Sequence, residues 1–108
     1  MASVPFSESV AVTGSGTIVI RASPGIGLRS FLTRVSAFAV DGGMRARLMA
    51  GATQRFGLFE QMMASGLLPS AVAISWPEDT PIELAYVVDE GATGYVNIEG
   101  LIQEVAPV

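Results

Sequence analysis

The stretch Leu28–Val40 constrains the fold of this chain more than any other part of the sequence. It is rich in β-branched and aromatic residues and is followed by Asp41-Gly42-Gly43, which is the pattern of a β-strand leading into a tight turn. Successive side chains of a strand point to opposite faces, so strict alternation puts Phe31 on one face and Phe38 on the other. Neither face is purely polar. We therefore expect one face to be covered by the domain's own core and the other by a partner chain.

The stretch after this turn alternates regularly. Residues 44–50 carry apolar side chains at even positions, with Arg45 and Arg47 on the opposite face. Two alternating runs joined by a Gly-containing turn predict a β-hairpin of residues 28–40 with residues 44–50. In that hairpin Arg34, Arg45 and Arg47 would line one face, either as a solvated surface or as a contact for an acidic partner.

The rest of the chain predicts further short strands and no amphipathic helix. Residues 1–16 are rich in small polar residues and are expected to form an extended N-terminal arm, with one short strand in it, before a single domain over residues 17–108. Glycine within the last strand, Gly100, indicates a bulge or close packing. The segment 51–66 fits a helix, with Phe56, Phe59 and Met63 at helical spacing, or a short strand, and we expect a strand followed by a loop there. The other expected strands are 17–21, 71–76, 82–88 and 95–105. This spacing of strands and Gly/Pro turns favours an all-β fold, an antiparallel β-sandwich or a barrel.

The composition excludes several classes of function. The chain has no Cys and no His, which removes disulfides, thiol nucleophiles, imidazole bases and zinc sites of the Cys/His kind. All six cations are Arg and the net charge is −4, so binding to nucleic acid through a basic surface is not expected. No apolar stretch reaches the ~18 residues of a membrane span, and no membrane partner is expected. Charged residues make up only 15% of the chain, which favours a protein whose faces are covered by partners.

Two groups of residues are candidates for chemistry, and each also has a structural interpretation. The acidic pairs Glu78-Asp79 and Asp89-Glu90 lie in expected turns, where carboxylates are simply solvated, and the spacing of a calcium loop is absent. We therefore expect no enzyme activity, no metal and no cofactor. Trp76, Tyr86 and Tyr95 could form a platform for carbohydrate, or could pack in the core or an interface.

The order of several segments points to one family. A hydrophobic strand with interspersed arginines (29–37) is followed by a Gly-containing turn and a second strand. A run of small residues then ends in Gly and aliphatic residues (64–69), an acid-bearing strand start follows (81–84), and the last strand finishes in Glu-Val (96–105). This pattern resembles small bacteriophage virion proteins of β-sandwich type, the capsid decoration or cement proteins. The resemblance implies a jelly-roll-like sandwich, often a homotrimer, that sits on the outer surface of a phage head and has no active site.

From this resemblance we expect a structural virion protein that binds the major capsid protein and stabilises the capsid. The alternatives are a tail, baseplate or fibre component, and a carbohydrate-binding module for attachment. The arm of residues 1–16 would reach a neighbouring capsid subunit. The residues expected at the interface are Phe31, Leu32, Arg34, Phe38, Arg45 and Arg47.

Overall fold

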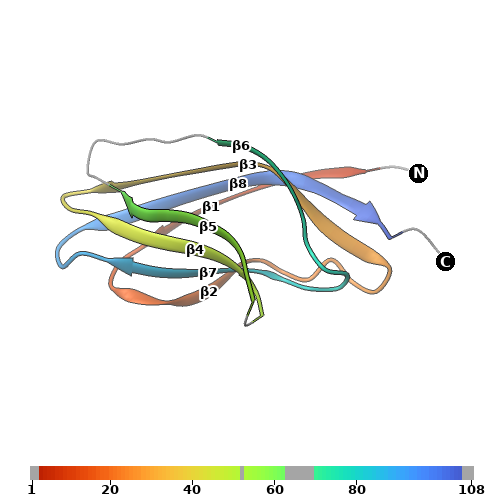
Figure 1. Ribbon diagram of the computed structural model, residues 1–108, viewed down its shortest axis with the longest axis horizontal. Coiled ribbons are helices and arrows are strands. Elements are labelled where there is room, and N and C mark those ends of the chain that lie inside the picture. The colour runs from red at the N-terminus through yellow and green to blue at the C-terminus, as the bar shows by residue number, and fades with distance from the viewer. Residues whose placement is uncertain (1–2, 52, 63–69, 106–108) are drawn as a thin grey trace.

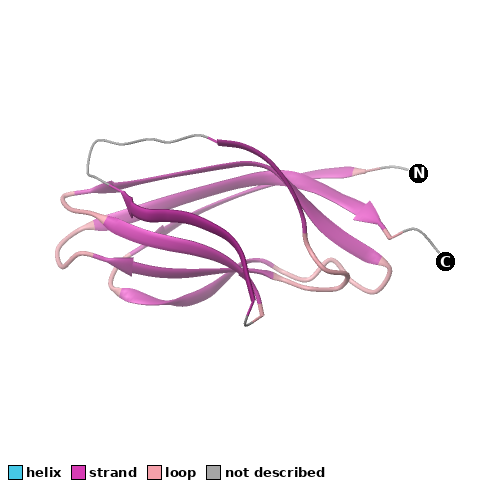
Figure 2. Ribbon diagram, in the orientation of Figure 1, coloured by secondary structure: helices cyan, strands magenta, loops and turns pink. Residues whose placement is uncertain are grey.

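The computed structural model describes residues 3–51, 53–62 and 70–105, and these residues form eight strands and no helix (Figures 1 and 2). The strands pack as two layers that run along the long axis of the molecule. Their bounds are β1 (Val4–Val12), β2 (Ser15–Arg21), β3 (Leu28–Val40), β4 (Met44–Ala50), β5 (Thr53–Met62), β6 (Ser70–Ser75), β7 (Ile82–Val88) and β8 (Thr93–Glu104).

The order of the strands is that of a jelly roll. Sheet A has the order β1-β8-β3-β6 and sheet B the order β2-β7-β4-β5, with every neighbouring pair antiparallel. Within each of the pairs β1/β2, β3/β4 and β7/β8, the chain crosses from one sheet to the other. Eight strands in two such sheets are the double-sheet jelly roll. The predicted fold class, an antiparallel, jelly-roll-like sandwich, is confirmed.

The core lies between the two sheets. Alternate residues of each strand point inward, as the period of two requires. Leu32 of β3, Leu48 of β4, Leu84 of β7 and Ile98 of β8 are completely buried. Burial of such side chains contributes about 1.5–3 kcal/mol each, so this layer supplies most of the driving force for folding.

The central strand β3 does not alternate strictly. Its pairing with β8 shifts between Leu32 and Arg34, so Thr33 is an extra residue, a β-bulge. Leu32 points inward before the bulge, and Val35 points inward after it. The prediction that Phe31 and Phe38 lie on opposite faces is therefore wrong. One inserted residue reverses the alternation, and both rings lie on the outer face of sheet A.

The predicted hairpin of residues 28–40 with residues 44–50 is also wrong. β3 and β4 lie in different sheets, and the turn between them is an arch across the sandwich. Asp41 has a φ of 66°, in the left-handed region that the turn chemistry indicated. The N–H of Gly43 donates to Oδ2 of Asp89 (2.8 Å), and the N–H of Asp89 donates to the carbonyl oxygen of Gly43 (3.0 Å). These bonds tie the arch to the turn between β7 and β8 instead of closing a hairpin.

The expected N-terminal arm is instead part of the sandwich. β1 pairs with β8 over nine consecutive residues, from Val4 opposite Ile102 to Val12 opposite Gly94. The expected boundary at residue 16 falls within β2. Phe6, Val10 and Val12 of β1 face the core, and this alternation outweighs the many serines around them. In the segment 51–66 the expected strand is present as β5, whereas the expected loop falls on residues outside the described ranges.

Candidate functional site

Three of the six expected interface residues meet on the outer face of sheet A. Phe31, Arg34 and Phe38 project from β3 on this side, because the bulge at Thr33 brings them into one row. Their cross-strand neighbours on β8 are, in the same order, Leu101, Glu99 and Tyr95. We call these six residues the sheet A face.

Apolar and polar rows alternate along the sheet A face. The rings of Phe38 and Tyr95 are stacked, with their centroids 4.8 Å apart and an angle of 18° between their planes. Nε of Arg34 lies 3.8 Å from Oε2 of Glu99, and the two side chains are 62% and 52% exposed. An ion pair this exposed contributes at most about 1 kcal/mol to stability, so both charges remain available to a partner. The face therefore combines half-buried aromatic rings with one charge of each sign.

The other three expected interface residues lie elsewhere. Leu32 is completely buried in the core and cannot contact a partner. Arg45 and Arg47 are exposed on the outer face of sheet B, on the far side of the sandwich from Arg34. The predicted row of three arginines is wrong, because the arch after β3 carries the chain into the other sheet.

The acidic pairs hold turns together. Oε2 of Glu78 accepts a hydrogen bond from the N–H of Gly27 (2.9 Å), and Asp79 accepts one from the hydroxyl of Ser23. Asp89 binds the arch after β3 in the same way, at the opposite end of the sandwich (Figure 1). Across the described ranges, no group of three or more acidic, His or Cys residues is placed to hold a metal ion. Within those ranges there is likewise no helix long and apolar enough to cross a membrane.

The three aromatic residues considered for a carbohydrate platform do not share a surface. Trp76 is only 1% exposed, and its Nε1–H donates to the carbonyl oxygen of Pro81 (3.1 Å). Tyr86 packs against the core from the inner face of sheet B, whereas Tyr95 belongs to the sheet A face. The predicted platform is therefore not formed by these residues.

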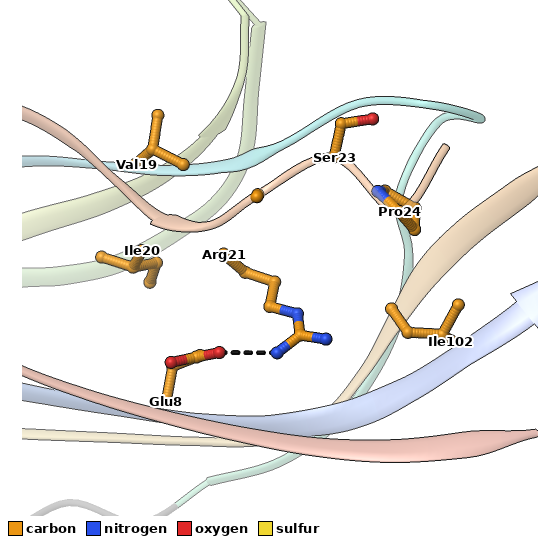
Figure 3. Close-up of a pocket in the computed structure, with 8 residues that line it drawn as sticks. Glu8, Val19, Ile20, Arg21, Ser23, Pro24 and Ile102 are labelled. Atoms are coloured by element: carbon orange, nitrogen blue, oxygen red, sulfur yellow. Dashed lines mark hydrogen bonds and ion pairs between the residues drawn. The ribbon is translucent and has the colours of Figure 1, made fainter. Parts of the chain in front are cut away.

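A second feature was not indicated by the sequence. A cavity of about 560 Å³ opens between the two sheets beside β1 and β2 (Figure 3). Nη1 of Arg21 crosses this opening to Oε2 of Glu8 (2.6 Å), and its guanidinium carbon lies 4.8 Å from the centre of the Phe6 ring. Near this cavity the sequence predicts a strand over residues 17–21 and does not indicate a cavity. The lining residues are Glu8, Val19, Ile20, Arg21, Ala22, Ser23, Pro24 and Ile102.

Comparison with known proteins identifies the fold and no family. No family model matches the chain, and no curated protein matches it. A chain in the acidic stable capsid structure of Helicobacter pylori bacteriophage KHP30 superposes with a TM-score of 0.62 and 12% identity, over 99% of this chain and 97% of that one. A chain of the cyanophage Pam1 capsid asymmetric unit superposes with a TM-score of 0.55 and 15% identity, over 93% of this chain and 83% of that one. The resemblance to β-sandwich chains of phage virions is confirmed at the level of the fold.

The same fold occurs outside virions. The carbohydrate-binding module CBM36, in complex with calcium and xylotriose, superposes with a TM-score of 0.53 and 11% identity, over 94% of this chain and 99% of that one. One sandwich architecture therefore hosts different functions, and the function of this chain has to be argued from its surfaces.

The position of Phe38 gives a first prediction. Phe38→Ala should lower the free energy of unfolding by only about 1 kcal/mol, because the change removes one stacked pair at a half-exposed site and leaves the core intact. Urea denaturation followed by circular dichroism measures the change. A loss above about 3 kcal/mol, typical of a buried Phe, would contradict the placement of this ring on the outer face.

Proposed function

We propose that this chain is a structural protein of a phage virion, a decoration or cement protein on the outer surface of the capsid, and not an enzyme. One observation carries the proposal: the jelly roll accounts for nearly the whole chain and matches nearly the whole of a chain in the KHP30 capsid structure. In the described residues such a sandwich offers mainly its faces and edges as binding surfaces.

The sheet A face supports a role in binding a large partner. Sheet A has four strands and β3 is 13 residues long, so its outer face measures up to about 19 by 43 Å, or about 800 Å². A standard protein interface buries about 800 Å² on each partner. Aromatic residues are enriched in interfaces, and the charges of Arg34 and Glu99 on this face offset each other. We assign the major capsid protein as the partner of this face.

The proposal includes several copies of the chain on each capsid, associated as a homotrimer. Linked copies bind a repeating surface more tightly than single copies, because each further contact is intramolecular. Weak individual contacts would then be sufficient to hold the shell against internal pressure.

Binding to shells tests the proposal. Purified protein should bind, at saturable stoichiometry, to shells of the encoding phage prepared without this gene, and should raise the temperature at which the shells rupture. The double variant Phe31→Asp/Phe38→Asp should bind at least about tenfold more weakly, because two buried anchors of the interface become charged. Arg45→Ser/Arg47→Ser, which changes the opposite face, is the matched control and should bind like the wild type.

Each result has a distinct meaning. If the protein neither binds shells nor occurs in purified particles, the virion role is wrong. If the control loses binding and the sheet A double variant keeps it, the virion role stands and the assigned face is wrong. Location of the protein in the tail or baseplate by electron microscopy would favour the tail alternative.

A carbohydrate-binding attachment module is the second candidate. The similarity of the fold to CBM36 favours it, and the stacked Phe38–Tyr95 pair is the half-exposed aromatic group on which a sugar ring could lie. Specific binding on a glycan array, lost in Phe38→Ala, would favour this function over the capsid role.

A further inference from the structure

The four edges of the sandwich are not equivalent. The edge strands are β1 and β6 in sheet A and β2 and β5 in sheet B. The register of β2 with β7 shifts near Val19, and the register of β5 with β4 shifts three times. β6 has only six residues. Bulges and short strands are the usual means by which natural sheets prevent pairing with other chains. β1 has nine residues in unbroken register with β8, and in the described part of the chain no strand pairs with its other side. β1 is therefore the edge open to strand addition.

The register shows which backbone groups of β1 face this open edge. The N–H of Val105 donates to the carbonyl oxygen of Gly27 (2.9 Å), so odd-numbered residues of β8 face β3 and even-numbered residues face β1. Phe6 is opposite Gly100, so the even-numbered residues of β1 face β8. The odd-numbered residues of β1 direct their N–H and C=O groups to the open edge. Pro5 agrees with this assignment, because a proline fits an edge strand where its missing N–H faces outward.

The side chains of β1 favour a second copy of β1 as the added strand, in one register. Centring a two-fold axis on Glu8 would place two carboxylates directly opposite each other, which is destabilising. Centring it nearer the start of the strand would use Pro5, which has no N–H to donate. Centring it on Ser9 pairs Ser9 with its copy and Ser7 with Ala11 of the copy, all small residues. This register forms about six backbone hydrogen bonds.

The inward side of the edge is compatible with such pairing. A charged side chain pointing inward on an edge strand normally discourages strand addition. The carboxylate of Glu8 is already bound by Arg21 at 2.6 Å, so its charge is compensated (Figure 3). The cavity beside it opens next to the edge and offers room for an apolar side chain of the added strand. In the Ser9 register, Val10 of the copy is opposite Glu8 and would lie at this opening.

We propose that β1 pairs, antiparallel and edge to edge, with β1 of a second copy across a two-fold axis at Ser9, which joins two copies of sheet A into one continuous sheet. A two-fold contact of this kind is self-complementary and closes on itself. This pairing of β1 with its copy does not depend on the capsid role. If the chain has no other contact between copies, the pairing forms a dimer. If the chain is a trimer as proposed, the pairing links one trimer to the next.

Single cysteines test this register, because the natural chain has no Cys. The Cα atoms of two paired Ser9 residues would be about 5.5 Å apart, within the range of a disulfide. Under mild oxidation Ser9→Cys should form a covalent dimer of twice the 11.2 kDa chain mass. Crosslinking should be on the order of 100-fold faster than in Ser7→Cys, because pairing raises the effective thiol concentration into the millimolar range. In Ser7→Cys the two copies of residue 7 would be about 14 Å apart.

Two further measurements complete the test. A mixture of the Ser7→Cys and Ala11→Cys proteins should crosslink, whereas neither protein should crosslink alone. Ser9→Pro should keep the fold by circular dichroism, because only the outward N–H is lost, and should abolish the association. Equal or absent crosslinking of Ser9→Cys and Ser7→Cys overturns the proposal. Faster crosslinking of Ser7→Cys overturns the register. If Ser9→Pro does not fold, the cysteine pairs still decide the question.

Discussion

Gly100→Ala should destabilise the protein by about 3 kcal/mol or more and lower its melting temperature by at least about 12 °C. Gly100 lies in β8 between Phe6 of β1 and the bulge of β3. A Cβ atom at this position would overlap the carbonyl oxygen of Phe31 and would lie 2.8 Å from Cζ of Phe6. The first of these neighbours is backbone and cannot rotate away. Overpacking at the centre of a sheet is therefore expected to separate β3 from β8.

Gly16→Ala is the matched control. Gly16 is also a strand glycine, in β2, and a Cβ atom there would come closest to the hydroxyl of Tyr86, at 3.2 Å, with the ring atoms of Tyr86 at ordinary contact distances. Because that hydroxyl is the far end of a side chain, it can shift, and the change in the free energy of unfolding should stay below about 1 kcal/mol. Differential scanning calorimetry of both variants measures the contrast. Equal melting temperatures for the two variants would show that β8 does not run this close to β3.

Trp76→Ala is the second substitution with a large expected effect. Trp76 follows β6 and is among the largest completely buried side chains. Its removal leaves a cavity and deprives the carbonyl oxygen of Pro81 of its donor, so the free energy of unfolding should fall by about 3–5 kcal/mol. Trp76→Phe keeps most of the ring and should lose about 2 kcal/mol. Because Trp76 is the single tryptophan, the unfolding curves should be followed by far-ultraviolet circular dichroism.

This prediction also separates a core role of Trp76 from a binding role. A Trp76→Ala protein that unfolds at the wild-type denaturant concentration and loses carbohydrate binding on a glycan array would place the ring at a surface site. Reduced stability of the Trp76→Ala protein, with no carbohydrate binding by this variant or by the wild type, would agree with the buried position.

The strands themselves could be predicted from local patterns. Residues 28–40, 44–50 and 82–88 are strands with the expected bounds, because β-branched alternation and Gly or Pro at the ends are properties of each segment alone. Strict alternation puts apolar residues on both sides of β3, because it omits Thr33, the one residue that changes the phase of the alternation. A bulge is stabilised by contacts with neighbouring strands, here at Gly100, and nothing within residues 28–40 signals it.

The candidate site could be predicted only in part, for the same reason. Phe31, Arg34 and Phe38 share a face, and Arg45 and Arg47 lie on the other side of the molecule, because the turn at 41–43 is an arch. Asp-Gly-Gly permits a left-handed backbone in a hairpin and in an arch alike. The choice depends on β8 and β7, which are far away in the sequence and offer β3 and β4 long partners in different sheets. The many serines of residues 1–16 predict an arm with at most a short strand, and they do not indicate that this segment forms an edge of sheet A.

The position of β8 determines the order of events during folding. β8 lies between β1 and β3, so neither of these two strands has its central partner until Thr93–Glu104 has left the ribosome. Until then sheet A can contain only the β3–β6 pair. β1 and β3 lack the strand that lies between them in the finished sheet. Sequence-distant pairings of this kind fold in milliseconds to seconds, and they cannot begin on a partial chain. The sandwich therefore completes its fold only after β8 has been synthesised, and a fragment that ends before Thr93 should be held by chaperones or aggregate.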